Sequence, residues 1–227
     1  DTGAVWKGTS ENAGGDYLLP IEDLRASFVN DPLFMYGPAE KFELTDGQSL
    51  GAVHEPYFDR SPRRYSGHIN APSKLDAETH VAGSEKGAFV QCAFPIFSLY
   101  HQVGAVAMLE FAENLIKRAL GDAPHLETTL PRSGRATLRH HNTRKSDILH
   151  LLCAHPVLRG QVRGNPVQPI QDLIPLHDIE VSLGSKSPTA VRLVPEGTDI
   201  PLSRRDGRTV FKVGKITGHQ MVEIIYA

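Results

Sequence analysis

The second half of the sequence is constrained most strongly by seven short runs with strand character, separated by polar or Gly/Pro-rich turns. Because the runs are short and closely spaced, they predict a small antiparallel β-sandwich over residues 122–227. The segment 157–168 is poor in apolar residues and is expected to be a mobile excursion between two strands. The expected strands are Leu126–Leu130, Ala136–His140, Ile148–Cys153, Ile179–Leu183, Ala190–Val194, Thr209–Val213 and Met221–Tyr226.

Residues 1–121 end in a different pattern, a strand over Ala88–Phe94 followed by a helix over Leu99–Leu120. Apolar residues in the helix fall on one stripe, and Gly121 is a natural C-cap. A strand, a short turn and a long helix resemble the last unit of an α/β sheet domain. The expected fold class is therefore α/β followed by all-β, with a partial α/β domain over 1–121 and the boundary near residue 122.

The region before this strand is less regular. Residues 1–20 are rich in glycine and are expected to form a loop or an interrupted element, followed by a short helix over 21–30. Lys41–Leu44 and Leu50–Val53 are predicted to pair around the turn Thr45-Asp46-Gly47. The apolar residues between His54 and Lys74 recur with neither a helical nor a strand period, which predicts a long loop. The aromatic residues of this loop argue against disorder.

Composition excludes several classes of protein. The formal charge of −2 over 227 residues is not that of a chain built around a nucleic-acid footprint. No apolar run is long enough for a membrane span. The two cysteines exclude a disulfide scaffold. No leader peptide is visible after Asp1. The compartment stays open, with a slight preference for the cytoplasm.

Some residues are of types that can be catalytic, but no sequence motif supports a catalytic role for them. Cys92 follows strand residues, as a nucleophile would, but no glycine turn leads from it into a helix. We therefore expect a buried structural cysteine. A glycosidase needs two facing carboxylates, for which Glu55, Asp59 and Glu110 are candidates without a known separation.

Four of the eleven histidines, His140, His141, His150 and His155, form the nearest cluster of possible metal ligands. His140 and His141 are adjacent, so on a strand they point to opposite faces. There is no HExxH motif and no paired CxxC motif. We expect scattered surface or packing histidines, with no metal site and no cofactor.

The loop after residue 54 carries the most informative combination of side chains. Glu55, Tyr57, Arg60 and His68 join aromatic rings to charged groups within one ordered segment. Sugars are commonly held by such mixtures, because ring faces stack on them and their hydroxyls bind charged partners. This predicts a substrate-cleft or interface loop. The alternative is that the aromatic residues only anchor the loop to the sheet or to a neighbouring subunit.

The order of several motifs resembles the trimerisation domain of family 42 beta-galactosidase-like glycoside hydrolases. The motifs are Tyr57-Phe58-Asp59-Arg60, Ser66-Gly67-His68 and Phe94-Pro95-Ile96-Phe97. The downstream region, with Leu173-Ile174-Pro175-Leu176 and Gly218-His219-Gln220-Met221-Val222, is similar to the C-terminal β-domain of that family.

The resemblance implies a partial amidotransferase-like (flavodoxin-like) α/β domain over 1–121, without the amidotransferase nucleophile, and a β-sandwich over 122–227. It places the catalytic glutamates on a (β/α)8 barrel that precedes these domains. The chain is then expected to be a C-terminal fragment. Sister subunits, in a homo-oligomer such as a trimer, are the implied partners. Carbohydrate would be bound through the missing barrel, with no nucleic acid and no membrane involved.

Three functions follow from these observations. The first is a non-catalytic oligomerisation and scaffold module of a glycoside hydrolase, inactive on its own. The second is a carbohydrate-binding β-sandwich with an α/β partner. The third is a small stand-alone hydrolase that uses Cys92 or a pair of carboxylates.

Overall fold

The computed structural model describes residues 2–74, 80–81, 83–87, 89–121, 124–184 and 187–227. The chain forms two compact units, Asp1–Asp122 and Ala123–Ala227. Residues 122–123, where the sequence predicts the boundary, lie outside the described residues. Every pairing between named strands is antiparallel in the part of the chain that the structure describes. No described helix is both long enough and apolar enough to span a membrane.

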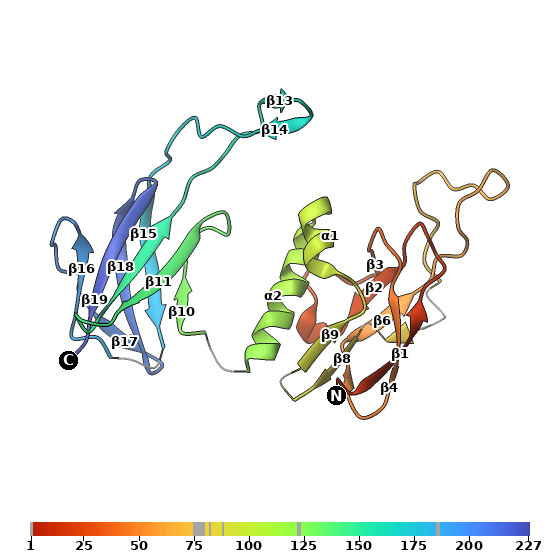
Figure 1. Ribbon diagram of the computed structural model, residues 1–227, viewed down its shortest axis with the longest axis horizontal. Helices are drawn as coiled ribbons and strands as arrows, with labels where there is room; N and C mark the ends of the chain where they lie inside the picture. Colours follow the sequence, from red (N-terminus) through yellow and green to blue (C-terminus); the bar gives the residue numbers. More distant parts are fainter. Residues whose placement is uncertain (1, 75–79, 82, 88, 122–123, 185–186) are drawn as a thin grey trace. The chain divides into compact units, whose positions relative to one another are not determined.

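The described residues of the first unit form three small sheets rather than one large sheet (Figure 1). One sheet pairs β1 (Ala4–Thr9) with β4 (Glu40–Leu44). The second has the order β3-β2-β6-β7, from β3 (Leu33–Phe34), β2 (Tyr17–Pro20), β6 (Gly51–His54) and β7 (His80–Val81). The third has the order β5-β8-β9, from β5 (Gln48–Ser49), β8 (Gly83–Lys86) and β9 (Phe89–Cys92).

The strands of the first unit correct two expectations and decide a third. Of the two alternatives for residues 1–20, the structure has the interrupted element, with β1 and β2 separated by a loop. The helix expected over 21–30 is reduced to the 3-10 helix η1 (Glu22–Leu24). The segments 41–44 and 50–53 do not pair with each other, because β4 binds β1 while β6 binds β2 and β7. The turn between them instead lies against the N-terminal segment. The backbone amides of Thr45 and Gly47 both donate to the Gly3 carbonyl oxygen at 3.0 Å.

Two glycines make this contact possible. A Cβ on Gly3 would lie 2.4 Å from the Gly47 Cα atom, closer than any side chain can approach. Gly3 also has a φ of 75°, in the left-handed region that favours glycine. The glycine-rich start of the chain is therefore structured by close backbone packing, which strand propensity does not detect.

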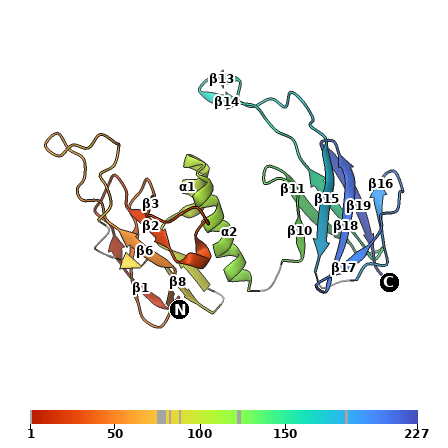
Figure 2. The same cartoon turned by 180° about the vertical axis from the view of Figure 1, so that it is seen from behind.

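Two helices cover one flank of these sheets (Figures 1 and 2). They are α1 (Ile96–Val103) and α2 (Val106–Leu120), where the sequence predicted one helix over 99–120. The break falls at Gly104, which adopts a left-handed φ of 70° and donates its backbone N–H to the Tyr100 carbonyl. The apolar stripe of α2, including the buried Met108, Phe111 and Leu115, packs into the core of the unit.

The amidotransferase-like α/β part is not confirmed. Helix α2 follows β9 and contacts it, as the pattern suggested. However, β9 is paired with β8 in an antiparallel hairpin, and no parallel pair occurs among the described residues. One apolar stripe on a helix predicts that the helix packs against a core, but it does not predict whether the sheet beneath is parallel or antiparallel. The molecule is mainly β, with sheets that are antiparallel throughout the described residues.

The second unit contains two four-stranded antiparallel sheets, as a β-sandwich requires. One has the order β10-β15-β18-β17, from β10 (Leu126–Thr128), β15 (Leu176–Leu183), β18 (Arg208–Ile216) and β17 (Ser203–Arg205). The other has the order β11-β12-β19-β16, from β11 (Arg135–His141), β12 (Ser146–Leu152), β19 (His219–Ile225) and β16 (Ala190–Val194). Their inner faces form one core that includes Leu149, Val181, Phe211 and Val222.

The segment expected to be an excursion is a two-stranded ribbon that projects from the sandwich (Figure 1). Its tip pairs β13 (Gly160–Val162) with β14 (Asn165–Val167), and the Val157 amide donates to the Pro169 carbonyl at 3.0 Å nearer its base. The excursion was thus placed correctly, but the pairing within it was missed.

Candidate functional site

The loop between residues 54 and 74 is closed at its base by a short ladder of contacts. The Tyr57 amide donates to the Pro72 carbonyl at 3.0 Å, and the Lys74 amide donates to the Glu55 carbonyl at 2.8 Å. The side chains of Glu55 and Lys74 form an ion pair across the same ladder, with a Nζ–Oε2 distance of 3.6 Å. This base, which we call the neck, fixes where the loop leaves the first unit.

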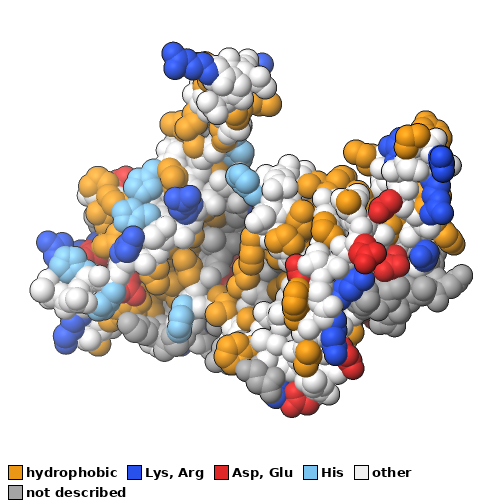
Figure 3. All heavy atoms as spheres, turned by 45° about the vertical axis from the view of Figure 1, so that its right-hand side comes forward, with side chains coloured by type: hydrophobic (Ala, Val, Ile, Leu, Met, Phe, Trp, Pro, Cys, Tyr) orange, Lys and Arg blue, Asp and Glu red, His pale blue; other side chains and the backbone are white. Residues whose placement is uncertain are grey.

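The outer part of the loop, residues 58–70, which we call the tip, projects from the unit (Figure 1), and most of its residues are exposed. Ser61 and Arg64 exchange two backbone hydrogen bonds of 3.0 and 3.1 Å and close a tight turn. The guanidinium carbon of Arg60 lies 5.4 Å from the centre of the Tyr65 ring, within cation–π range. Figure 3 shows basic side chains in blue on this projecting part of the first unit.

A hollow of about 310 Å³ lies where the loop meets the glycine-rich segment 13–15. The buried Tyr17 holds two of its lining residues, because its hydroxyl donates to the Ala71 carbonyl at 2.6 Å and accepts a hydrogen bond from the Asn70 amide. The lining combines two aromatic rings with an acid, an amide and a guanidinium. The residues that matter for recognition are Gly14, Phe34, Phe58, Asp59, Arg60 and Asn70.

The structure separates the four residues that the sequence selected for this loop. Arg60 lines the hollow. Glu55 belongs to the neck. Tyr57 is 58% exposed, and His68 is exposed at the tip, where its carbonyl accepts a hydrogen bond from the Ser66 hydroxyl at 3.0 Å. The four residues therefore belong to one loop, but they do not converge on one ligand position in the described structure.

Sequence reasoning missed part of the hollow. Phe34 and the Gly14 region come from segments far from the loop in sequence, and only folding brings them together. The pair Gly14-Gly15 was a usable signal of close backbone packing, because Gly15 has a φ of 117° and a Cβ there would lie 2.6 Å from the Gly37 amide nitrogen.

The other catalytic candidates lie elsewhere. Burial raises the pKa of the Cys92 thiol to about 11, although the backbone amides of Phe94 and Ala93 act in the opposite direction. A thiol with this pKa is protonated at neutral pH and is a poor nucleophile. Of the three carboxylates that were considered, only Asp59 lines the hollow, while Glu110 lies on α2.

The histidines of the second unit are bound to different partners. His140 Nδ1 lies 2.6 Å from Asp147 Oδ1, and His155 Nε2 lies 3.0 Å from the Ser133 hydroxyl. His150 Nδ1 faces His219 Nε2 at 3.2 Å. No group of three or more His, Cys, Asp and Glu side chains within the described ranges is placed to hold a metal ion.

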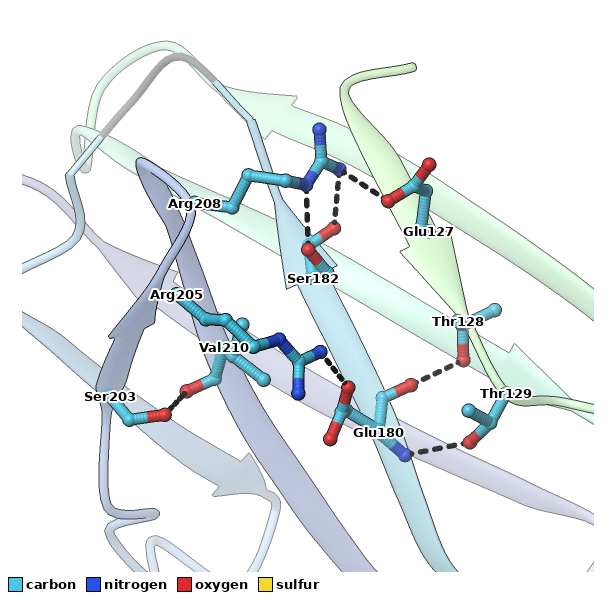
Figure 4. A network of polar contacts seen from close by, with 9 residues as sticks. All are labelled: Glu127, Thr128, Thr129, Glu180, Ser182, Ser203, Arg205, Arg208 and Val210. Atoms are coloured by element: carbon cyan, nitrogen blue, oxygen red, sulfur yellow. Dashed lines mark hydrogen bonds and ion pairs between the residues drawn. The ribbon is translucent and has the colours of Figure 1, made fainter. Parts of the chain in front are cut away.

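A network of polar contacts ties together the strands of one sheet of the sandwich (Figure 4). The Arg208 guanidinium donates to the Ser182 hydroxyl at 2.6 Å and lies 3.3 Å from Glu127, so it links β10, β15 and β18. Arg205 hydrogen-bonds to Glu180, and this bond lowers the pKa of that half-buried carboxyl. A hollow of about 320 Å³ beside the network has no aromatic lining. The network is thus suited to holding the short strand β10 in the sheet.

The whole chain is similar to part of a known enzyme. It matches an alpha-L-fucosidase, isoenzyme 2 from Paenibacillus thiaminolyticus, with 33% sequence identity, a TM-score of 0.90 and coverage of 100% of this chain. It spans only 34% of the length of that fucosidase. This likeness relates the chain to glycoside hydrolases, but it does not single out family 42.

Other comparisons add little. A beta-galactosidase from Bacillus circulans sp. alkalophilus matches with 10% identity and a TM-score of 0.49, over 98% of this chain and 24% of that one, a likeness too weak to bear on the function. No family model matches the sequence, and no curated protein is similar to it.

Proposed function

We propose that this chain is a non-catalytic oligomerisation and scaffold module of an alpha-L-fucosidase-like glycoside hydrolase, whose catalytic barrel we expect outside the chain. The observation that carries the proposal is the likeness of the entire chain to one third of the solved fucosidase. On the sequence resemblance, the assembly we propose is a trimer of such subunits.

Within that assembly, we assign to the loop over residues 54–74 the role of walling a sister subunit's substrate cleft. Two features support this. The neck holds the base of the loop by main-chain hydrogen bonds, and the tip extends away from the unit with its side chains exposed. Tyr57 and Tyr65 are 58% and 76% exposed. The loop is therefore not anchored to its own sheet by these two rings, and they are available to a neighbour.

Each predicted residue then has a distinct role. Arg60 would donate hydrogen bonds from its planar guanidinium to sugar hydroxyls at the edge of the cleft. Tyr57 would offer a ring face, and His68 a polar contact at the tip. Glu55, through its ion pair with Lys74, is a positioning residue that holds the neck and does not reach the sugar.

The test uses the full-length protein that carries this chain and an α-L-fucoside with a chromogenic leaving group. Arg60→Ala is expected to lower kcat/KM roughly tenfold, because a hydrogen bond from a charged donor contributes about 1.5–3 kcal/mol. His68→Ala should have a smaller effect in the same direction. The melting temperature and the oligomeric mass should stay at their wild-type values.

Arg63→Ala is the matched control, because Arg63 is an equally exposed arginine of the same loop that does not line the hollow. Unchanged kinetics in both Arg60→Ala and His68→Ala would remove the role of the loop. A monomeric full-length protein with full activity would contradict the oligomerisation role itself.

A further inference from the structure

The only tryptophan of the sequence, Trp6, is displayed on the surface of the first unit. It lies in β1, where 60% of the residue is exposed, and its neighbour Val5 is 47% exposed. Tryptophan is a residue that proteins usually bury to a large extent. An exposed indole in a paired strand therefore needs a structural cause.

The cause is an irregularity in the pairing of β1 with β4. Trp6 is paired with Phe42, whereas Gly8 is paired with Lys41, so Lys7 is an extra residue in β1. Such a bulge turns side chains away from the regular alternation of a strand. Gly8 accommodates it with a φ of 115°, and Phe42 stays buried while Trp6 does not.

The exposed indole is also held in one orientation. Its Nε1–H donates to Glu40 Oε2 at 2.6 Å. The Thr9 hydroxyl lies 3.1 Å from the same oxygen and 3.3 Å from Glu40 Oε1. The Glu40 amide donates to the Ala93 carbonyl at 2.8 Å, so the residue that holds the indole is itself tied to the core of the unit.

We propose that Trp6, Glu40 and Thr9 form a surface site for a single sugar ring. The indole face would stack on the C–H groups of the ring, and the carboxylate and the hydroxyl beside it would bind the sugar hydroxyls. None of these residues lines the hollow at the loop over 54–74. The site is therefore an additional carbohydrate contact, independent of the proposed cleft wall.

The surroundings favour a sugar over a protein partner. Tryptophans at the centre of protein interfaces are surrounded by residues depleted in charge. Trp6 is instead bordered by the exposed ion pair of Lys7 with Glu43, at 2.7 Å, and by the Glu40 carboxylate. A ring face framed by charged groups suits a ligand that is apolar on one face and rich in hydroxyls at its rim.

Because Trp6 is the only tryptophan of this 227-residue chain, the fluorescence of the chain expressed by itself reports the site directly. We would titrate this chain with methyl α-L-fucoside, methyl β-D-galactoside and cellobiose while recording tryptophan emission. At least one of these sugars is expected to change the emission saturably. Glu40→Gln should weaken its affinity roughly three- to tenfold, because it loosens a positioned aromatic contact and removes a charged acceptor. Val5→Ala is the control and should bind like the wild type.

A second readout covers loss of the fluorophore. The wild-type chain should broaden the NMR signals of a sugar that it binds. Trp6→Ala should not broaden them, and Trp6→Phe should retain part of the broadening. If none of the three sugars changes the emission at the highest soluble concentrations, the site is not a sugar site. Emission that changes with protein concentration alone, together with self-association that Trp6→Ala abolishes, would assign the indole to a protein interface and overturn the proposal.

Discussion

The two units use strands in different ways. In the second unit, strands such as β12 and β19 pair over seven consecutive positions, and the two sheets share one continuous core. In the first unit, strands as short as two residues meet in three small sheets, and helices supply much of the apolar packing. Long ladders leave little freedom for irregular backbone, whereas short ones end in loops and bulges. Both candidate sites, the hollow at the loop and the exposed indole, lie in the irregular unit.

The largest expected effects test whether the two units are energetically separate. Phe111→Ala in α2 and Phe211→Ala in β18 each remove a buried ring and should cost about 3–5 kcal/mol of unfolding free energy. Each variant should lower only one of two transitions in differential scanning calorimetry. Phe97→Ala, at an exposed phenylalanine of α1, should leave both transitions nearly unchanged. A single transition that falls in both core variants would show that the units unfold together.

The next largest effect is a dependence of stability on pH that is expected only in the first unit. The pKa of the Cys92 thiol is raised from 9.0 to about 11 in the folded protein, mainly by burial. Above the lower value the unfolded thiol ionises while the folded thiol keeps its proton, so stability falls as the pH rises from 9 toward 11.

Urea unfolding at pH values of about 8 and 10.5 should show a loss on the order of 2 kcal/mol in the wild type that is missing in Cys92→Ala. The difference should appear in the transition of the first unit. An identical pH dependence in both proteins would mean that Cys92 ionises normally in the folded state.

A smaller effect is expected from the edge of the second core. The Tyr226 hydroxyl donates to Asp147 Oδ2 at 2.7 Å, and burial together with this carboxylate raises the pKa of Tyr226 above its ordinary value. Tyr226→Phe should therefore destabilise the second unit by about 1.5 kcal/mol, measured by urea unfolding. Tyr65→Phe, at the exposed loop tip, is the matched control and should be close to neutral. Equal effects of the two changes would show that the Asp147 contact contributes nothing.

The sandwich was largely predictable because the apolar runs visible in the sequence are also the strands whose side chains fill its core. Each of the seven expected runs overlaps a strand, and Ala190–Val194 matches β16 at both ends. Alternating burial along a paired strand is visible in the sequence itself. The strands that were missed, β13, β14 and β17, are three residues long each and mostly exposed, so burial left no pattern to recognise.

The first unit resisted prediction because its structure depends on contacts between distant residues. The stripe of α2 was recognised, but the break at Gly104 was read as part of one helix. The prediction of a hairpin around Thr45-Asp46-Gly47 was wrong, because the backbone amides of this turn bind the carbonyl oxygen of Gly3. In the loop, residue types selected Arg60 and Glu55 together. They could not show that Arg60 would line a hollow with Phe34 and Gly14, while Glu55 would belong to the neck.

The neck of the loop has a consequence for how such proteins diverge. Main-chain hydrogen bonds between residues 55–57 and 72–74 hold it together, and these depend little on which side chains the tip carries. Substitutions between residues 58 and 70 can therefore accumulate at small thermodynamic cost to the unit. If the loop walls a cleft as proposed, selection can change its ligand preference through the tip alone, without new mutations in the scaffold to compensate.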